Sequence, residues 1–139
     1  MADAGTLKGL SVTMKKHPKS MKLSGPLLPV LEKALPGQEN IIFQGPVRTL
    51  APLAPNNVNT MACAAIAGYN IGFDNTTAIL ISDDRLDCHV VVVEVIGPSS
   101  GEYGDFKVVT TRTNPAPPGA VTGNQTYASF FSSLKKAKG

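Results

Sequence analysis

The sequence predicts an α+β fold built on one mainly antiparallel or mixed sheet, with helices on one face. Strand-like segments outnumber helical ones, and three of them follow one another in the second half of the chain. This grouping favours antiparallel pairing over a doubly wound parallel sheet. A length of 139 residues matches one domain with a substantial core. We therefore expect residues 1–139 to form a single domain.

Composition narrows the class of protein. The chain is 42% hydrophobic and 17% charged, which is typical of a globular domain. It contains no apolar run of about 18 residues and no secretory signal pattern at its start, so we predict a cytoplasmic protein without a membrane span. The net charge of +3 comes largely from lysines near the two ends, and tryptophan is absent. This pattern does not predict a nucleic-acid surface. Two cysteines without metal-like spacing predict free thiols and no metal site.

The first half of the chain alternates strands with short helices. Apolar and polar residues alternate over residues 8–16, which predicts a half-exposed strand. Residues 27–35 are bounded by prolines and predict a connecting helix. The segment 41–50, IIFQGPVRTL, predicts a further strand. Because Gly45 and Pro46 interrupt it, we expect this strand to bend there or to lie at an edge of the sheet.

An asparagine-rich turn precedes the next helix. Residues 61–67 contain only small or apolar side chains, and Gly68 follows them, so we expect a short buried helix that ends at the glycine. Asn57, Asn59 and Thr60 lie at its start, where side chains cap free N–H groups. A helix start also suits a bound carboxylate or phosphate. We therefore expect Asn57 and Thr60 to contact a substrate; the alternative is that these residues only form the turn.

The second half predicts three strands, a stiff loop and a helix. Residues 76–82 predict a compact strand, and residues 106–113 predict a strand that pairs as a hairpin with the valine-rich segment before it. The loop 113–123, TNPAPPGAVTG, is rich in proline and glycine and is predicted to be irregular. The last helix is predicted to place an aromatic stripe on the core, because its large apolar residues recur at i, i+3, i+4 and i+7. These residues are Tyr127, Phe130, Phe131 and Leu134.

The segment 83–97, DDRLDCHVVVVEVIG, contains the candidate catalytic residue. His89 begins a strand rich in β-branched residues, and it shares one face with Val91 and Val93. Both faces of this strand are apolar, so we expect both to be covered, one by helices and the other by a second subunit. A histidine at a strand end titrates near neutral pH and can transfer protons. The alternative is a histidine that is only hydrogen-bonded there. Cys88 points to the other face, which argues against a Cys–His pair.

Three segments together resemble a known family. They are LAPLAPNNVNTMACAAIAGYNIGFD, SDDRLDCHVVVVEVIGP and NPAPPGAVTG, and in order and spacing they resemble the C-terminal domain of the L-aspartate dehydrogenase family, over essentially the whole chain. The resemblance implies a homodimeric two-domain enzyme. An N-terminal Rossmann domain, without counterpart in this sequence, binds NAD or NADP. The reaction converts L-aspartate to iminoaspartate, which yields oxaloacetate and ammonia or feeds NAD biosynthesis.

The resemblance also implies roles for single residues. His89 falls on the family's catalytic histidine, and Asn59 falls on an asparagine that the family uses for the cofactor. Many members have Asn-x-His where this chain has Asp87-Cys88-His89. Two alternatives remain open at this point. One is a non-enzymatic dimerisation module that has lost its cofactor domain, and the other is a dehydrogenase or reductase for another small dicarboxylate.

Overall fold

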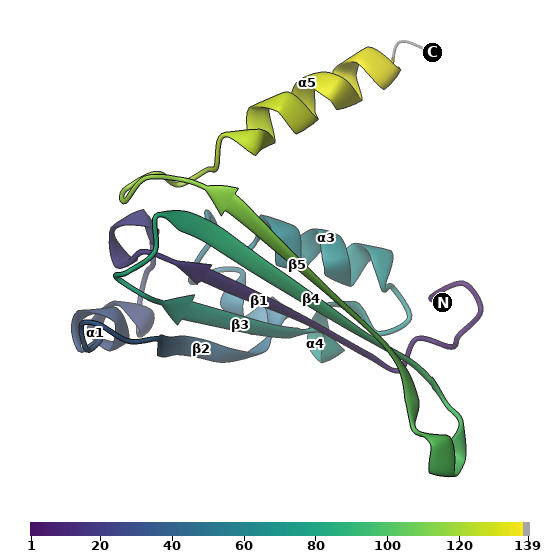
Figure 1. Cartoon of the computed structure of the whole chain (residues 1–139). Helices are drawn as coiled ribbons and strands as arrows, with labels where there is room; N and C mark the ends of the chain where they lie inside the picture. Colours follow the sequence, from purple (N-terminus) through teal and green to yellow (C-terminus); the bar gives the residue numbers. More distant parts are fainter. Residues whose placement is uncertain (138–139) are drawn as a thin grey trace.

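A computed structural model describes residues 1–137 and contains one five-stranded sheet in the order β2-β3-β1-β4-β5 (Figure 1). β1 and β3 pair in parallel, and the other neighbouring strands pair antiparallel. The predicted α+β class with a mixed sheet is therefore confirmed. The strands are β1 (Gly9–Lys16), β2 (Asn40–Pro46), β3 (Thr77–Ser82), β4 (Cys88–Ser99) and β5 (Asp105–Pro115).

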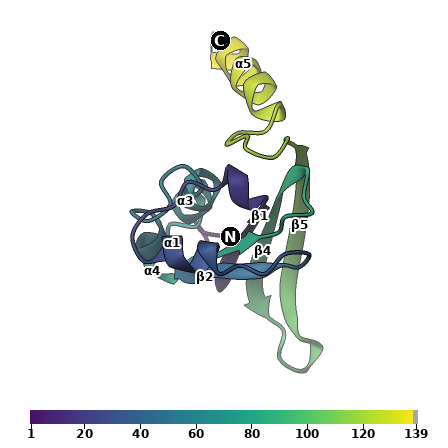
Figure 2. The same cartoon turned by 90° about the vertical axis from the view of Figure 1, so that its left-hand side faces the viewer.

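Four short helices lie on one face of the sheet. Figure 2 shows α1, α3 and α4 together on the same side of the strands, and α2 packs against β2 and β3. The α-helices are α1 (Leu27–Glu32), α2 (Val47–Leu50), α3 (Asn59–Ala67), α4 (Gly72–Asn75) and α5 (Gln125–Ala137). Two 3-10 turns are η1 (Pro18–Ser20) and η2 (Gly101–Tyr103).

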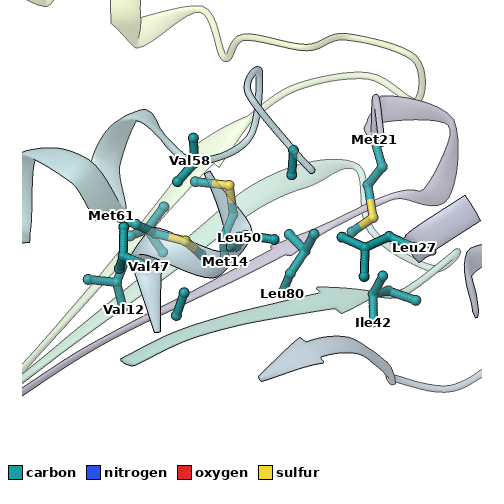
Figure 3. Close-up of a cluster of buried hydrophobic side chains, with 13 residues drawn as sticks. Val12, Met14, Met21, Leu27, Ile42, Val47, Leu50, Val58, Met61 and Leu80 are labelled. Carbon is teal, nitrogen blue, oxygen red and sulfur yellow. The ribbon is translucent and has the colours of Figure 1, made fainter. Parts of the chain in front are cut away.

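The core lies between the sheet and these helices. Even-numbered residues of β1, among them Val12 and Met14, face the helices and are buried, because side chains alternate between the faces of a strand. They pack with Leu80 of β3, Leu50 of α2 and Met61 of α3 (Figure 3). Figure 3 shows these side chains gathered between the strands and the helical layer. This core holds the ends of β1 and β4 in register.

One predicted strand ends earlier than expected. The segment 41–50 is predicted to be one strand with a bend at Gly45 and Pro46; β2 instead ends at Pro46, where the chain turns into α2. Val47 and Leu50 are both fully buried, because a helical turn places residues i and i+3 on the same side. The amide of Val47 donates to the carbonyl of Thr76 at 3.0 Å, which fixes this turn against the start of β3. The predicted edge position of β2 is confirmed.

The predictions for α3 are partly wrong. The helix occupies the predicted segment and ends at Gly68, whose amide donates to Ala64 O. Val58 is its N-cap residue, and no side chain caps the helix. Asparagine capping is therefore wrong. The helix is also not fully buried: it buries Met61 and Ala65, while Ile66 on its outer side is 64% exposed.

The face of the sheet opposite the helices, here called the open face, is not covered by any helix of the described chain. It carries apolar side chains from four strands, because paired residues of neighbouring strands share a face. These include Ile41, Ile79, Val90, Val92, Ile96 and Val109. Ile41 and Val109 are 60% and 52% exposed. Within this chain the helices lie on one face of the sheet, and the open face carries these apolar side chains together with charged ones such as Lys15 and Glu94.

The last helix contradicts the prediction of an aromatic stripe on the core. α5 forms where it was predicted, but it extends away from the sheet (Figure 1) and none of its residues is buried. Phe130 and Phe131 are 66% and 59% exposed. The amphipathic pattern correctly predicted a helix. It did not predict that the aromatic side chains of this helix lie away from the core.

Truncation of the chain after Thr126 is expected to change the free energy of unfolding by less than about 0.5 kcal/mol, because exposed side chains remote from the core contribute little. Urea unfolding of the truncated and complete chains measures the difference. A loss above about 1 kcal/mol would show that α5 packs on the sheet domain in solution.

Candidate active site

The site is assembled at one end of three neighbouring strands, on the helix side of the sheet. His89 of β4 pairs with Asn114 of β5, so both side chains face the same way. Lys15 of β1 pairs with Val90 of β4, which places the neighbouring Lys16 on the same face and beside His89. Strand register thus aligns Lys16, His89 and Asn114 in one row.

This row forms the floor of a cavity of about 160 Å³. Its walls come from the turn before α3 and from the loop between β5 and α5. Drug-sized ligands usually occupy pockets of roughly 300–1,000 Å³, so the cavity suits a small molecule and not a complete dinucleotide. The lining residues are Met14, Lys16, Asn56, Asn57, Asn59, Thr60, His89, Val91, Arg112, Asn114, Val121, Thr122, Gly123 and Thr126.

The hydrogen bond of His89 determines which ring nitrogen is protonated. The side chain is buried, with 6% of its surface exposed, and Nε2 lies 3.0 Å from the carbonyl oxygen of Ala120. A carbonyl oxygen only accepts, so Nε2 carries the hydrogen and Nδ1 carries the lone pair of the neutral ring. Burial, aided by the charge of Lys16, lowers the pKa of His89 below 6.5, and the hydrogen bond to Ala120 opposes this only in part. At neutral pH the ring is therefore an unprotonated base.

Lys16 is a buried cation in the same cavity. Only 3% of its surface is exposed, and its Nζ donates to the carbonyl of Val121 at 3.0 Å. Burial lowers the pKa of Lys16 to about 8, so the ammonium is still mostly protonated at pH 7. Arg112 of β5 is the second cation of the cavity, and no aspartate or glutamate is among its lining residues in the described part of the chain. The cavity therefore favours an anion.

Asn57 contributes a buried acceptor without a partner. The side chain is 1% exposed, and its Nδ2 donates to the carbonyl of Lys22 at 3.2 Å. Because that carbonyl only accepts, the orientation of the amide is fixed, and Oδ1 is left without a hydrogen bond. A buried unpaired acceptor costs about 1–3 kcal/mol.

All four residues predicted from the sequence line this one cavity. His89 and Asn57 are buried, Thr60 is half-buried, and Asn59 is exposed in the first turn of α3.

Sequence reasoning missed Lys16, Arg112 and Asn114, although a signal for each was present. Lys16 continues the even-numbered series of buried residues in β1, and a lysine on the core face of a strand is unusual. Arg112 and Asn114 lie two residues apart on β5 and pair with Val91 and His89, so alternation along the predicted strand puts them on the face of His89. Asn114 also meets the following loop closely, since a Cβ on Gly123 would lie 2.2 Å from its Nδ2.

Other site classes find less support. Cys88 lies on the face opposite His89, and burial raises the pKa of its thiol, so the thiol stays protonated at neutral pH. Within residues 1–137 no three histidine, cysteine or acidic side chains are grouped as a metal site would require. No helix in the same range has the length and hydropathy that crossing a membrane requires.

A sequence model of the aspartate dehydrogenase C-terminal domain matches residues 1–133. The chain belongs to the aspartate dehydrogenase family. Two similar members are named aspartate dehydrogenase domain-containing protein. The one from Xenopus tropicalis is 49% identical over an alignment of 141 positions that covers 100% of this chain and 49% of the relative. The one from Danio rerio is 49% identical over an alignment of 140 positions that covers 100% of this chain and 48% of the relative.

More distant family members extend the comparison to bacteria. An L-aspartate dehydrogenase from Psychrobacter cryohalolentis is 37% identical over 95 residues, which are 63% of this chain and 33% of the relative. The crystal structure of aspartate dehydrogenase from Thermotoga maritima matches with a TM-score of 0.51 and 18% identity, over 78% of this chain and 39% of that chain. This likeness supports the fold. The chain spans about half the length of the two vertebrate relatives.

Proposed function

We propose that this chain is the substrate-binding and catalytic half of an NAD(P)-dependent L-aspartate dehydrogenase. The observation that carries the proposal is a buried, neutral histidine in a small cavity that is lined by two cations and no acid. Such a cavity suits a small anionic substrate that must lose a proton. The family assignment supports aspartate as that substrate.

His89 acts as the general base in this proposal. The amine of L-aspartate must lose its proton before hydride can leave Cα, and the Nδ1 lone pair of His89 accepts that proton. The bond from Nε2–H to Ala120 O holds the ring in the required tautomer. Once iminoaspartate has formed, the protonated ring returns its proton to the imine nitrogen, and the neutral ring then takes a proton from a water molecule that attacks the imine carbon and gives it to the departing nitrogen. That step gives oxaloacetate and ammonia.

Two asparagines and a threonine position the reactants. Asn57 lines the cavity from the turn before α3, and Thr60 lines it from the first turn of that helix, so both would contact the substrate. Asn59, which is exposed and lines the cavity at the same helix end, would bind the cofactor through its neutral side-chain amide. NAD or NADP, when bound, accepts the hydride. Because the cavity holds only a small molecule, we expect the dinucleotide to bind mainly to another domain.

A two-domain chimaera tests this function. It joins this chain to the part of the Xenopus tropicalis relative that the chain does not match, which is about half of that protein. We expect reduction of NAD or NADP that depends on L-aspartate. Turnover with another small dicarboxylate instead would favour a different dehydrogenase or reductase. A folded chimaera that reduces neither cofactor with any of these acids would favour a non-enzymatic module.

We also propose that the open face forms a homodimer. Six apolar side chains lie on a sheet surface that no helix of the described chain covers, and large exposed apolar patches are typical of interfaces. A twofold axis would pair this face with its own copy.

Val92→Asp is expected to convert a dimer to monomers, because it places a charge at the centre of the open face. Sedimentation equilibrium measures the change. Val30→Asp is the matched control, since Val30 is 41% exposed on α1 and lies away from that face. A monomeric parent chain, or a dimer that survives Val92→Asp, would refute this interface.

A further inference from the structure

We infer that Lys16 binds a carboxylate of a small dicarboxylate substrate. Its buried ammonium group has no counter-ion within the described chain, and the substrate carboxylate would supply one. The inference rests on the proposed function for the identity of the substrate. It concerns a residue that neither the sequence patterns nor the family resemblance singled out.

The position of Lys16 is unusual for a lysine. It ends β1 on the face that buries Leu10, Val12 and Met14, and only 3% of its surface is exposed. Burying an ammonium costs several kcal/mol unless it is paired. No acidic side chain of the described chain forms an ion pair with it. A lysine that served only as a solvated surface charge would not be placed here.

The donors of Lys16 are only partly used. An ammonium group has three N–H donors, and one of them bonds the carbonyl of Val121. That bond fixes the loop wall of the cavity and leaves two donors for a ligand in the space the side chain lines. A carboxylate oxygen would give the buried charge both a counter-ion and a hydrogen bond.

A second cation, Arg112, explains why the anion would be a dicarboxylate. Arg112 lines the same cavity from β5, two strands from β1 and therefore roughly 10 Å away along the sheet. Both side chains are long enough to reach inward over His89, which lies on the strand between them. One cation is thus available for each carboxylate of a four-carbon diacid.

Lys16 also acts on the base. Its charge helps to keep His89 unprotonated, which is the form that accepts a proton. Removing the charge should let the pKa of His89 rise. The charged residues that line the cavity on the strands flanking His89 are Lys16 and Arg112, and the lining residues from the α3 turn are uncharged.

Succinate, a dicarboxylate without an amine, is the probe for this inference. Isothermal titration of the complete chain is expected to show binding that weakens at least tenfold in Lys16→Met and that also weakens above about pH 8, where Lys16 loses its proton. Lys15→Met is the matched control, because Lys15 is the adjacent lysine, faces the opposite side of the sheet and pairs with Glu39. It should bind succinate as the parent chain does. Butyrate, with one carboxylate, should bind more weakly than succinate.

Two readouts separate binding from a structural role. Lys16→Met should be no less stable than the parent chain, since an apolar side chain replaces an uncompensated buried charge. The pKa of His89, followed by NMR, should rise in this variant and not in Lys15→Met. If Lys16→Met does not fold, Lys16→Gln replaces it in the same titrations. Equal succinate affinity with and without Lys16, or no succinate binding by the folded parent chain, would overturn the inference. Lys16-dependent binding in a chimaera that oxidises no substrate would instead refute only the proposed function.

Discussion

His89→Gln in the two-domain chimaera is expected to lower kcat by about 10²–10⁴-fold, which is the usual contribution of a positioned general base. Glutamine keeps a polar side chain of similar reach but cannot accept a proton at neutral pH. The fold should be unaffected, because His89 lies at the end of β4 and outside the hydrophobic cluster. Measured rates of L-aspartate-dependent cofactor reduction check this expectation.

The other histidine provides the control for this substitution. His17 begins η1, where its Nδ1 accepts from the amide of Lys19 at 3.1 Å. It does not line the cavity, so His17→Gln should leave kcat within about twofold of the parent value. The parent kcat/KM should also fall with decreasing pH through the pKa of His89, which lies below 6.5, because protonation removes the base. Near-normal turnover in His89→Gln would disprove the catalytic role.

Leu80→Ala is expected to give the largest loss of stability, about 2–5 kcal/mol. Leu80 is fully buried on β3, between β2 and β1, and packs under the helical layer (Figure 3). Truncation to alanine leaves a cavity at the centre of the core, and the strands on both sides limit its collapse. Domains of this size are stable by roughly 5–15 kcal/mol in total, so the loss is a large share. Urea unfolding measures the change.

The matched control for Leu80 is an apolar residue on the surface. Ile66 of α3 is 64% exposed, so Ile66→Ala should change the free energy of unfolding by less than about 0.5 kcal/mol. If the two substitutions cost the same, the core does not lie where the structure places it.

The strands were predictable from the sequence, because apolar and polar residues alternate along a strand that has one buried face. β1, β3, β4 and β5 form where the patterns of apolar and branched residues placed them. Gly45 and Pro46 indicated a change of direction at the end of β2, but the helical turn of α2 was not predicted, because Val47 and Thr49 favour strands locally and the bond from Val47 to Thr76 is not visible in the sequence. Tertiary contacts override weak local preferences in such short segments.

The sequence pattern also did not predict contacts between segments that are distant along the chain. The stripe of α5 correctly predicted a helix, yet periodicity cannot tell which surface an apolar face meets. The asparagines before α3 likewise suggested capping, whereas Asn57 bonds the distant carbonyl of Lys22. That hydrogen bond joins residues 35 positions apart, so a local sequence pattern cannot predict it.

Only part of the candidate site was predictable from the sequence. His89 and the polar turn before α3 were identified from residue type and position, and the structure brings them to one cavity. Lys16 was missed because lysine was treated as a surface residue, although alternation already placed it on the core face. The signal for Lys16 was a charged residue at the position where the alternation of β1 predicts another buried apolar side chain.

NMR of the His89 ring tests whether this residue is an unprotonated base in an anion-binding cavity. In the chain labelled with ¹⁵N at histidine, the account predicts a pKa below 6.5 and a neutral ring protonated on Nε2. It also predicts that succinate raises this pKa, because a bound anion stabilises the imidazolium. A ring that titrates at or above 6.5, carries its proton on Nδ1 and does not respond to succinate would contradict the account.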